Sequence, residues 1–121
     1  MDARKNLGAA GEAAAIAFLV SKGVHILKRN YRCRMGEIDI LARQGSIYLV
    51  IEVKTRRKHG QGFPGEAVDL RKQAKICRAF DYYRMCRRLK EDTPVRFDVI
   101  EIDQALHCRW IPNAFEYIER F

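Results

Sequence analysis

The sequence predicts a single α/β domain with the element order α-β-β-β-α-β, in which a mixed sheet is flanked by helices. Two segments carry apolar residues at helical spacing, and four carry the alternating or continuous apolar pattern of strands. The length of 121 residues suits one domain that buries its own core.

The first helix is expected from about Asp2 to Lys22, where alanines favour the helix and Gly23 ends it. Asp2 is placed to cap its start. Helical spacing predicts a buried face made of Leu7, Ala10, Ala14, Ala17 and Phe18. A first strand follows from about Val24 to Arg32.

The central segment predicts a β-hairpin. Two strand-like runs, Glu37–Ala42 and Ile47–Lys54, flank a turn signal at Gln44-Gly45. Alternation places seven side chains on one face, namely Ile38, Ile40, Ala42, Ile47, Leu49, Ile51 and Val53. All seven are apolar, which supports this assignment of faces.

The remaining segments complete the predicted domain. Arg56–Gly65 is basic and glycine-containing and should be a loop, and Glu66–Leu89 should form a second helix. Its core side is predicted to carry Leu70, Ala74, Cys77, Phe80 and Tyr83. Val95–Ile102 alternates as a strand, and residues 110–121 are apolar enough to pack as a short strand or helix.

The second face of the hairpin collects charged side chains. With a two-residue turn at Gln44-Gly45, Glu37 lies opposite Glu52, and Asp39 is a diagonal neighbour of Glu52 at about 7–8 Å between Cα atoms. Neighbouring carboxylates repel each other and need a counter-charge. Lys54, on the same face, supplies one positive charge, and a divalent cation would supply two. Hard oxygen ligands suit Mg²⁺ or Mn²⁺ rather than zinc.

An alternative explanation of these acids is an edge hairpin whose carboxylates pair with Lys and Arg in water. This is the commoner meaning of an E-x-K pattern on a strand. Here, however, Asp39 lies within Ile38-Asp39-Ile40, and Glu52 has Ile51 and Val53 as neighbours. An acid in such an apolar setting usually has a specific partner, which favours a functional site.

The positive charge is concentrated in one third of the chain. The net charge is +8 overall, whereas residues 54–90 hold twelve basic residues against three acidic ones, a local net charge of +9. This asymmetry indicates a polyanionic partner, nucleic acid before membrane, and a solvated helix face is the alternative. Three aromatic residues, Tyr31, Phe63 and Tyr82, are placed to stack on an unpaired base, although each is also a common packing residue.

Targeting and cysteine usage indicate a cytoplasmic protein. No apolar run is long enough to span a membrane, and Glu12 interrupts the N-terminal alanines that a signal peptide would need. The four cysteines are widely spaced and are expected to be reduced packing residues. A zinc site made of Cys33, Cys108 and His107 is the alternative, but tight ligand pairs are missing.

Five short motifs carry a resemblance that covers Asn6 to Phe121: Gly11-Glu12, Asn30-Tyr31-Arg32, Gly36-Glu37-Ile38-Asp39, Glu52-Val53-Lys54-Thr55-Arg56 and Arg96-Phe97-Asp98-Val99. Together they resemble the bacterial YraN-like proteins, which are grouped with Holliday-junction-resolvase-like folds. Asp39 with the E-x-K of β-strand residues 52–54 is similar to the PD-(D/E)xK nuclease signature. The resemblance implies a restriction-endonuclease-like core. The proline of that signature is absent, because Ile38 precedes Asp39, but this position varies widely in such nucleases.

The resemblance also implies a site and its chemistry. Asp39, Glu52 and the Val53 carbonyl would bind Mg²⁺ or Mn²⁺, and Lys54 would orient or activate water and stabilise charge on phosphate. Glu12 matches the first-helix acid of resolvase-like members, and it shares a helical face with Ile16 and Leu19. Lys72 and Gln73 match a polar position that reaches the site in related nucleases, although solvent exposure is the alternative for each. With the basic loop and the basic second helix, the residues expected to contact nucleic acid are Arg56, Arg57, Lys58, Arg71, Lys72, Gln73, Lys75 and Arg78.

The function expected from these features is a metal-dependent endonuclease that hydrolyses phosphodiester bonds, with structure-selective DNA favoured over RNA. No base-reading helix is recognisable, which argues against sequence-specific recognition. Junction-processing relatives act as dimers, so the resemblance implies a homodimer. Two alternatives stay open: a non-catalytic nucleic-acid-binding module on a nuclease scaffold, and an interaction domain whose basic surface takes an acidic protein partner.

Overall fold

The computed structural model describes residues 3–56 and 68–119, and it places side chains from Gly8 onward. In these ranges the elements are α1 (Ala3–Ser21), β1 (His25–Cys33), β2 (Gly36–Gln44), β3 (Ile47–Thr55), α2 (Leu70–Cys86), β4 (Val95–Ile102) and β5 (Cys108–Phe115). The predicted α/β fold with flanking helices is therefore confirmed, and the C-terminal stretch contributes a fifth strand. Neither described helix is both long and apolar enough to span a bilayer.

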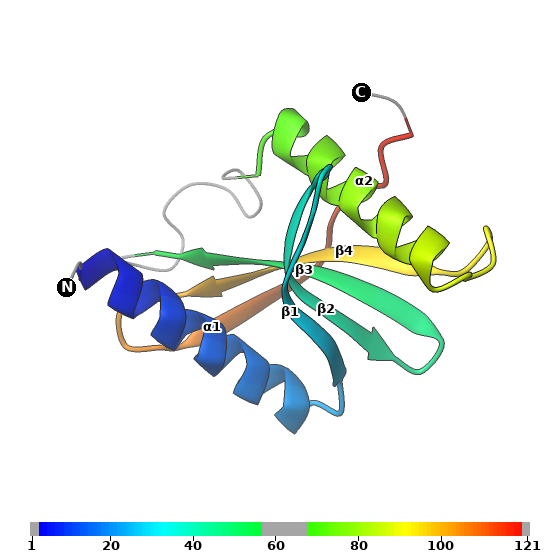
Figure 1. Cartoon of the computed structure of the whole chain (residues 1–121). Helices are drawn as coiled ribbons and strands as arrows, with labels where there is room; N and C mark the ends of the chain where they lie inside the picture. The colour runs from blue at the N-terminus through cyan, green and yellow to red at the C-terminus, as the bar shows by residue number, and fades with distance from the viewer. Residues whose placement is uncertain (1–2, 57–67, 120–121) are drawn as a thin grey trace.

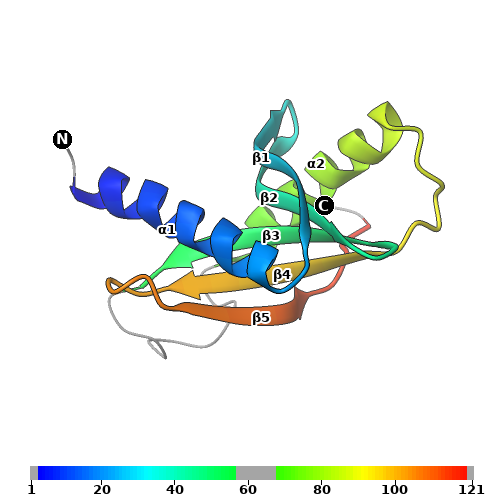
Figure 2. The same cartoon turned by 90° about the horizontal axis from the view of Figure 1, so that it is seen from below.

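The strands lie in one sheet in the order β1-β2-β3-β4-β5. Neighbours are antiparallel except for β3 and β4, which are parallel. The parallel pair requires a crossover connection, and α2 lies within it. Figures 1 and 2 show α1 on one face of the sheet and α2 on the other.

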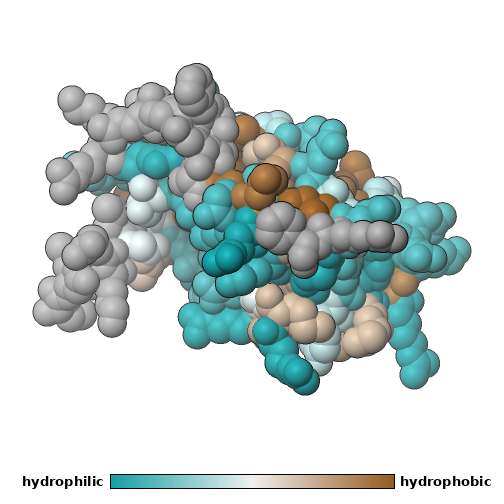
Figure 3. All heavy atoms as spheres, turned by 90° about the horizontal axis from the view of Figure 1, so that it is seen from above, coloured by the Kyte–Doolittle hydropathy of each residue, from teal (hydrophilic) through white to brown (hydrophobic). Residues whose placement is uncertain are grey.

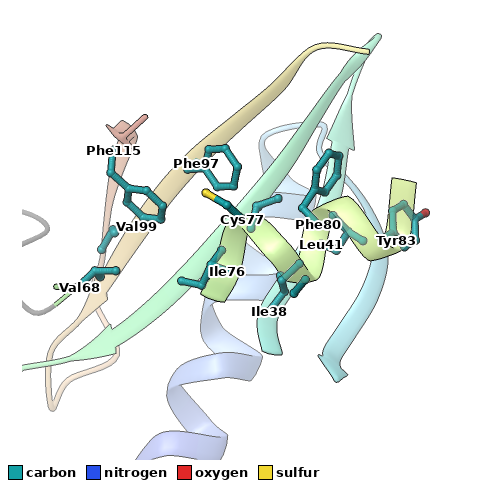
Figure 4. Close-up of a cluster of buried hydrophobic side chains, with 12 residues drawn as sticks. Ile38, Leu41, Val68, Ile76, Cys77, Phe80, Tyr83, Phe97, Val99 and Phe115 are labelled. Atoms are coloured by element: carbon teal, nitrogen blue, oxygen red, sulfur yellow. The ribbon is translucent and has the colours of Figure 1, made fainter. Parts of the chain in front are cut away.

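Each face of the sheet has its own apolar core. On the α2 side, shown in Figure 4, Leu41, Val50 and Phe97 pack under Cys77 and Phe80 of the helix. On the α1 side, the core consists of Ala15, Leu19, Val24, Ile40, Ala42, Leu49, Ile51, Ile100 and Ile102. Two layers of helix therefore bury both faces of the central strands, as expected for an α/β domain.

The buried face of α1 differs from the prediction. Ala15 and Leu19 are buried, whereas Ala10 and Ala17 are exposed. Alanines occur on every side of this helix and give little amphipathic signal, so the spacing of the small residues could not identify the packed side. The Asp2 cap lies outside the described residues.

The second helix is shorter than predicted and begins after Asp69. The Asp69 side chain accepts a hydrogen bond from the Lys72 backbone N–H at 2.8 Å, the usual N-cap contact. Its core side includes the predicted Ala74, Cys77, Phe80 and Tyr83. Leu70 was predicted on that side but is 62% exposed, because it lies in the first turn beyond the edge of the core.

The hairpin register differs from the prediction by two residues. Gln44 pairs with Ile47 and Leu41 pairs with Val50, so the turn residues are Gly45 and Ser46. Gly45 has a φ of +60°, which suits glycine at the first central position of a type II′ turn. Side chains alternate between the two faces of a strand, so a shift of two residues leaves each side chain on its predicted face. The predicted faces are therefore correct for most of the hairpin.

The outer end of β2 is the exception to that assignment. The predicted opposition of Glu37 and Glu52 is wrong, because Glu37 is exposed and pairs with Arg32 at 3.2 Å. Ile38, predicted on the same face as Ile40, packs instead in the α2-side core. Figure 1 shows why: the end of the β1–β2 hairpin turns out of the plane of the sheet toward α2.

Candidate active site

Asp39 lies where β2 leaves β3. The described β2–β3 pairing ends at Ile40 and Ile51. Beyond Ile51, the next β3 amide that faces the β2 side is that of Val53, and it donates to Asp39 Oδ2 at 2.9 Å. A side-chain oxygen thus takes the place that a strand carbonyl would fill, and the carboxylate is held at the fork between the two strands.

Glu52 lies beside Asp39 and is 4% exposed. Its carboxylate is close enough to Asp39 to raise the pKa of that residue through both charge and a hydrogen bond. Lys54 Nζ lies 3.5 Å from Glu52 Oε1, and Lys72 Nζ forms an ion pair with the same oxygen. Two acids and two lysines, contributed by β2, β3 and α2, therefore meet on the α2 side of the sheet.

The protonation of this cluster departs from ordinary values. Burial, followed by the charge of Glu52, raises the pKa of Asp39 from 3.8 to about 7, although the Val53 hydrogen bond and Lys72 act in the other direction. Burial and the nearby Lys72 lower the pKa of Lys54. Burial also opposes the charge of Lys72, but contacts with Glu52 outweigh it and raise the pKa of Lys72.

The donor set of the site fits a hard divalent cation. Asp39 and Glu52 provide carboxylate oxygens, and the Val53 carbonyl points to the same side of β3 as its N–H, which faces Asp39. Two lysines already neutralise Glu52, whereas burial and the charge of Glu52 both disfavour the ionised form of Asp39 and raise its pKa. Within residues 3–56 and 68–119 no group of three or more His, Cys, Asp or Glu could hold a metal. Mg²⁺ is commonly held by one or two carboxylates and completed by substrate phosphate.

A third buried acid lies next to the site and was not singled out by the sequence analysis. Glu101 pairs with Lys54 in the β3–β4 register and is 1% exposed. Arg56 Nε lies 3.3 Å from its Oε2, and Arg109 Nη1 lies 3.7 Å from its Oε1. The signal that identified Asp39, an acid between apolar strand residues, was present in Ile100-Glu101-Ile102 as well.

One predicted site residue, Glu12, belongs to the first helix rather than to the central strands. Glu12 is on α1, next to Gly11, which approaches Thr55 and Ile102. Its Oε1 is buried without a hydrogen-bond partner among the described residues. Its role stays a prediction.

Besides Lys72, three predicted nucleic-acid contacts interact with groups of the chain itself: Gln73, Arg78 and Arg56. The Gln73 amide donates to the Val68 carbonyl at 2.8 Å. Arg78 lies 3.0 Å from Asp81 and also donates to the carbonyls of Ile118 and Glu119. Arg56 is engaged by Glu101, as described above, whereas Arg57 and Lys58 lie outside the described residues.

The alternative zinc site is not formed. Cys33 is at the end of β1 and Cys108 at the start of β5, which are the two opposite edges of the sheet. His107 lies 3.1 Å from Asp103, through its Nδ1. All four cysteines are free: Cys77 is buried, as a packing residue would be, whereas Cys33 and Cys108 are half-buried and Cys86 is exposed.

Lys72, which pairs with Glu52, also lines a basic hollow of about 660 Å³. This hollow lies between the turn of the β1–β2 hairpin and the start of α2. Five basic residues line it: Arg32, Arg34, Arg71, Lys72 and Lys75. Because Lys72 belongs both to this hollow and to the Glu52 ion pair, it links the hollow to the site. Seen from the α2 side in Figure 3, the surface is largely hydrophilic, with apolar atoms only in small patches.

Close packing of Gly36 on α2 forms the hollow. A Cβ atom at Gly36 would lie 2.8 Å from the Lys75 carbonyl oxygen, so only glycine permits this approach. The hairpin cations Arg32 and Arg34 were missed by the sequence analysis, which followed charge along the chain. Only tertiary docking brings them beside Lys72 and Lys75.

The fold and the acid–lysine cluster define an α/β protein whose arrangement is consistent with a restriction-endonuclease-like core. The chain belongs to the family described as "Uncharacterised protein family UPF0102", whose model matches residues 11–102. It is 45% identical to a UPF0102 protein of Symbiobacterium thermophilum, over 92% of this chain and 97% of the relative. It is 43% identical to a UPF0102 protein of Lachnoclostridium phytofermentans, over 93% of this chain and 95% of the relative. The predicted similarity to YraN-like proteins is thereby confirmed.

Proposed function

We propose that this protein is a divalent-metal-dependent endonuclease that hydrolyses phosphodiester bonds in nucleic acid. One observation carries the proposal: two carboxyl groups, Asp39 and Glu52, meet two lysines, Lys54 and Lys72, and Lys72 also lines a basic hollow. Buried like charges of this kind are characteristic of sites whose chemistry needs them.

Hydrolysis of a phosphodiester forms a bond from water oxygen to phosphorus and breaks the bond from phosphorus to the leaving oxygen. Asp39, Glu52 and the Val53 carbonyl would hold Mg²⁺ or Mn²⁺. When bound, such an ion polarises the phosphoryl oxygen and acidifies water, an effect worth several kcal/mol.

The lysines have different tasks in this proposal. Lys54 has a lowered pKa and is neutral more often than an ordinary lysine, so it can orient the attacking water and accept its proton. Lys72 has a raised pKa and stays cationic, so it suits a phosphate oxygen on which negative charge grows. Arg71 and Lys75 would hold flanking phosphates, as sequence-independent contacts.

The test is cleavage of branched, single-stranded and duplex DNA, each incubated with Mg²⁺, with Mn²⁺ or with EDTA. Metal-dependent cleavage by the wild type is expected, with a loss of about a hundredfold or more in Asp39→Ala and Lys54→Ala. Asp92→Asn, an exposed acid outside the site, is the matched control and should cleave normally. Cleavage that persists in Asp39→Ala would exclude this site as its source.

A non-catalytic nucleic-acid-binding module is the second candidate. It is favoured by the two lysines, which neutralise Glu52 without any metal. It predicts no product with any metal. It also predicts that DNA affinity falls with rising salt, and that each duplex phosphate contacted adds about −0.9 to the slope of log affinity against log salt concentration. A homodimer, and the preference for DNA over RNA, stay predictions.

A further inference from the structure

The turn of the β1–β2 hairpin also lines a second hollow, toward the C-terminal end of α2. This smaller hollow, of about 500 Å³, is lined by Arg32, Cys33, Arg34, Met35 and Tyr82. Met35 is 44% exposed and also lines the larger basic hollow. The hairpin turn therefore stands between a basic hollow that leads to Lys72 and a hollow that offers an apolar tip and an aromatic ring.

The charges around the turn suit a polyanion. Arg34 and Lys75 are exposed. Of the two acids that line the larger hollow, Glu37 is paired with Arg32 and Asp69 caps α2, so neither opposes an incoming phosphate freely. A chain of phosphates can follow this surface from Lys72 outward.

Phosphate binding alone gives no role to Met35 and Tyr82. An exposed methionine among arginines matches the apolar wedges that unstack bases in nucleic acids. An accessible aromatic ring beside arginines matches the platforms on which unpaired bases stack. Tyr31, the other aromatic residue of this region, does not fill that role, because it packs edge-on against Tyr83 at 5.6 Å between ring centroids.

We propose that the substrate carries unpaired bases next to the scissile phosphate, with Met35 at the junction of paired and unpaired regions and one base stacked on Tyr82. The proposal rests on the proposed function, which places the scissile phosphate at Lys72. It adds the substrate class: nucleic acid with a bulge, gap, flap or branch rather than intact duplex.

The experiment measures binding without cleavage, by fluorescence anisotropy in EDTA. The two ligands are a labelled duplex and the same duplex with a three-nucleotide bulge. Wild type is expected to bind the bulged DNA about tenfold more tightly. Tyr82→Ala should lose about five- to tenfold in affinity for bulged DNA and little for duplex, whereas Tyr82→Phe, which keeps the ring, should retain the preference.

Met35→Ala should also reduce the preference for bulged DNA over intact duplex, by about threefold. Val20→Ala is its control, since Val20 is an exposed apolar residue of α1, on the opposite face of the sheet. A 2-aminopurine placed in the bulge gives an independent readout in the wild type, because stacking on Tyr82 quenches its fluorescence. This readout keeps the test decisive even where Tyr82→Ala folds poorly.

Equal binding of bulged and intact duplex by the wild type, or an equal loss for both in Tyr82→Ala, would overturn the inference. The result is separable from the proposed function. A protein that prefers the bulge but cleaves nothing rejects the nuclease function alone, and one that cleaves intact duplex without preference rejects only the substrate class.

Discussion

Asp98 and Asp39 both lie in apolar stretches of strand, yet their surroundings differ. Asp98 is fully buried and accepts four hydrogen bonds. Arg96 donates two of them, from Nε at 2.9 Å and Nη2 at 2.8 Å, and Trp110 Nε1 and the Asn113 N–H donate the others at 2.8 and 2.9 Å. Asp39 accepts a hydrogen bond from the Val53 N–H, and the other side chain that it contacts is a second acid, Glu52.

The difference separates a structural acid from a candidate functional one. The oxygens of Asp98 are occupied by neutral and cationic donors, as buried polar groups normally are. The ionised form of Asp39 is disfavoured by burial and by Glu52, so this carboxylate gains stability when it binds a proton or a cation. The same sequence signal, an acid in an apolar run, marked both residues, and only their partners distinguish them.

The largest expected effect is the loss of stability in Asp98→Ala. The substitution leaves the fully buried position without a carboxylate, and the Trp110 and Asn113 donors and the Arg96 guanidinium lose their acceptor. A fall of about 3–4 kcal/mol in the free energy of unfolding is expected. Urea denaturation measures it, followed by the emission of Trp110, the only tryptophan. A change below about 1 kcal/mol would show that the Asp98 network contributes little, and the comparison with Asp39 would fail.

The opposite sign is expected for Asp39→Asn in the absence of metal. Asn keeps an oxygen for the Val53 N–H but carries no charge next to Glu52. The folded-state pKa of Asp39 is raised to about 7, so its ionised form costs stability at pH 8. A gain of about 2 kcal/mol is expected, since each pKa unit is worth about 1.4 kcal/mol and the cost is shared with Glu52.

The pH dependence of that gain provides its control. The cost of ionised Asp39 is fully present above pH 7 and disappears as the pH falls from about 7 toward 3.8, because the folded protein takes up the proton first. The stability difference between Asp39→Asn and wild type, measured in EDTA, should therefore shrink over this range. A difference that grows on acidification would contradict the raised pKa.

The affinity for metal should depend on pH in the same window. Mn²⁺ must displace the proton of Asp39, so its affinity should rise by up to about tenfold per pH unit below 7 and level off above it. Isothermal titration at several pH values in buffers of different ionisation enthalpy measures both affinity and proton release. Asp39→Asn should bind Mn²⁺ weakly and without this pH dependence. If the Mn²⁺ affinity of the wild type does not change with pH, Asp39 is not a ligand of the metal.

The smallest effect is expected for Gly36→Ala, which tests how far the Asp39 region depends on the hairpin. Its Cβ would meet the Lys75 carbonyl oxygen at 2.8 Å, so the hairpin must shift. This shift should lower the free energy of unfolding by about 1 kcal/mol. DNA affinity should fall because the basic hollow is displaced. Trp110 emission should not change, because the Asp98 region lies on the other side of the sheet from α2. A change in Trp110 would show that the two regions are coupled.

The sequence was sufficient for the element order and for the convergence of Asp39 and Glu52. Strand alternation determines which side chains share a face, and the misassigned turn residues moved the register by two, which left that parity unchanged. Parity failed only at Ile38, where the hairpin turns toward α2. Local pattern cannot reveal such a bend, because the docking of Gly36 on a distant helix produces it.

The residues around the carboxylates were harder to predict. The resemblance, and not the helix periodicity, indicated that Lys72 reaches the site, and its ion pair with Glu52 depends on how α2 packs across the sheet. Arg34 and Met35 gave no signal, because single residues in a turn have no pattern. Their importance arises from their position relative to Lys75, which lies on an element far along the chain.

The contact between Gly36 and the Lys75 backbone also bears on selectivity. Main-chain atoms in direct contact cannot be compressed, so the spacing between the hairpin turn and α2 is set when the chain folds. A ligand therefore meets a preformed shape and loses no affinity to ordering it. The protein can then select ligands by shape with little loss of binding free energy. A molecule whose shape does not match the space between the hairpin turn and α2 binds poorly, whatever its base sequence.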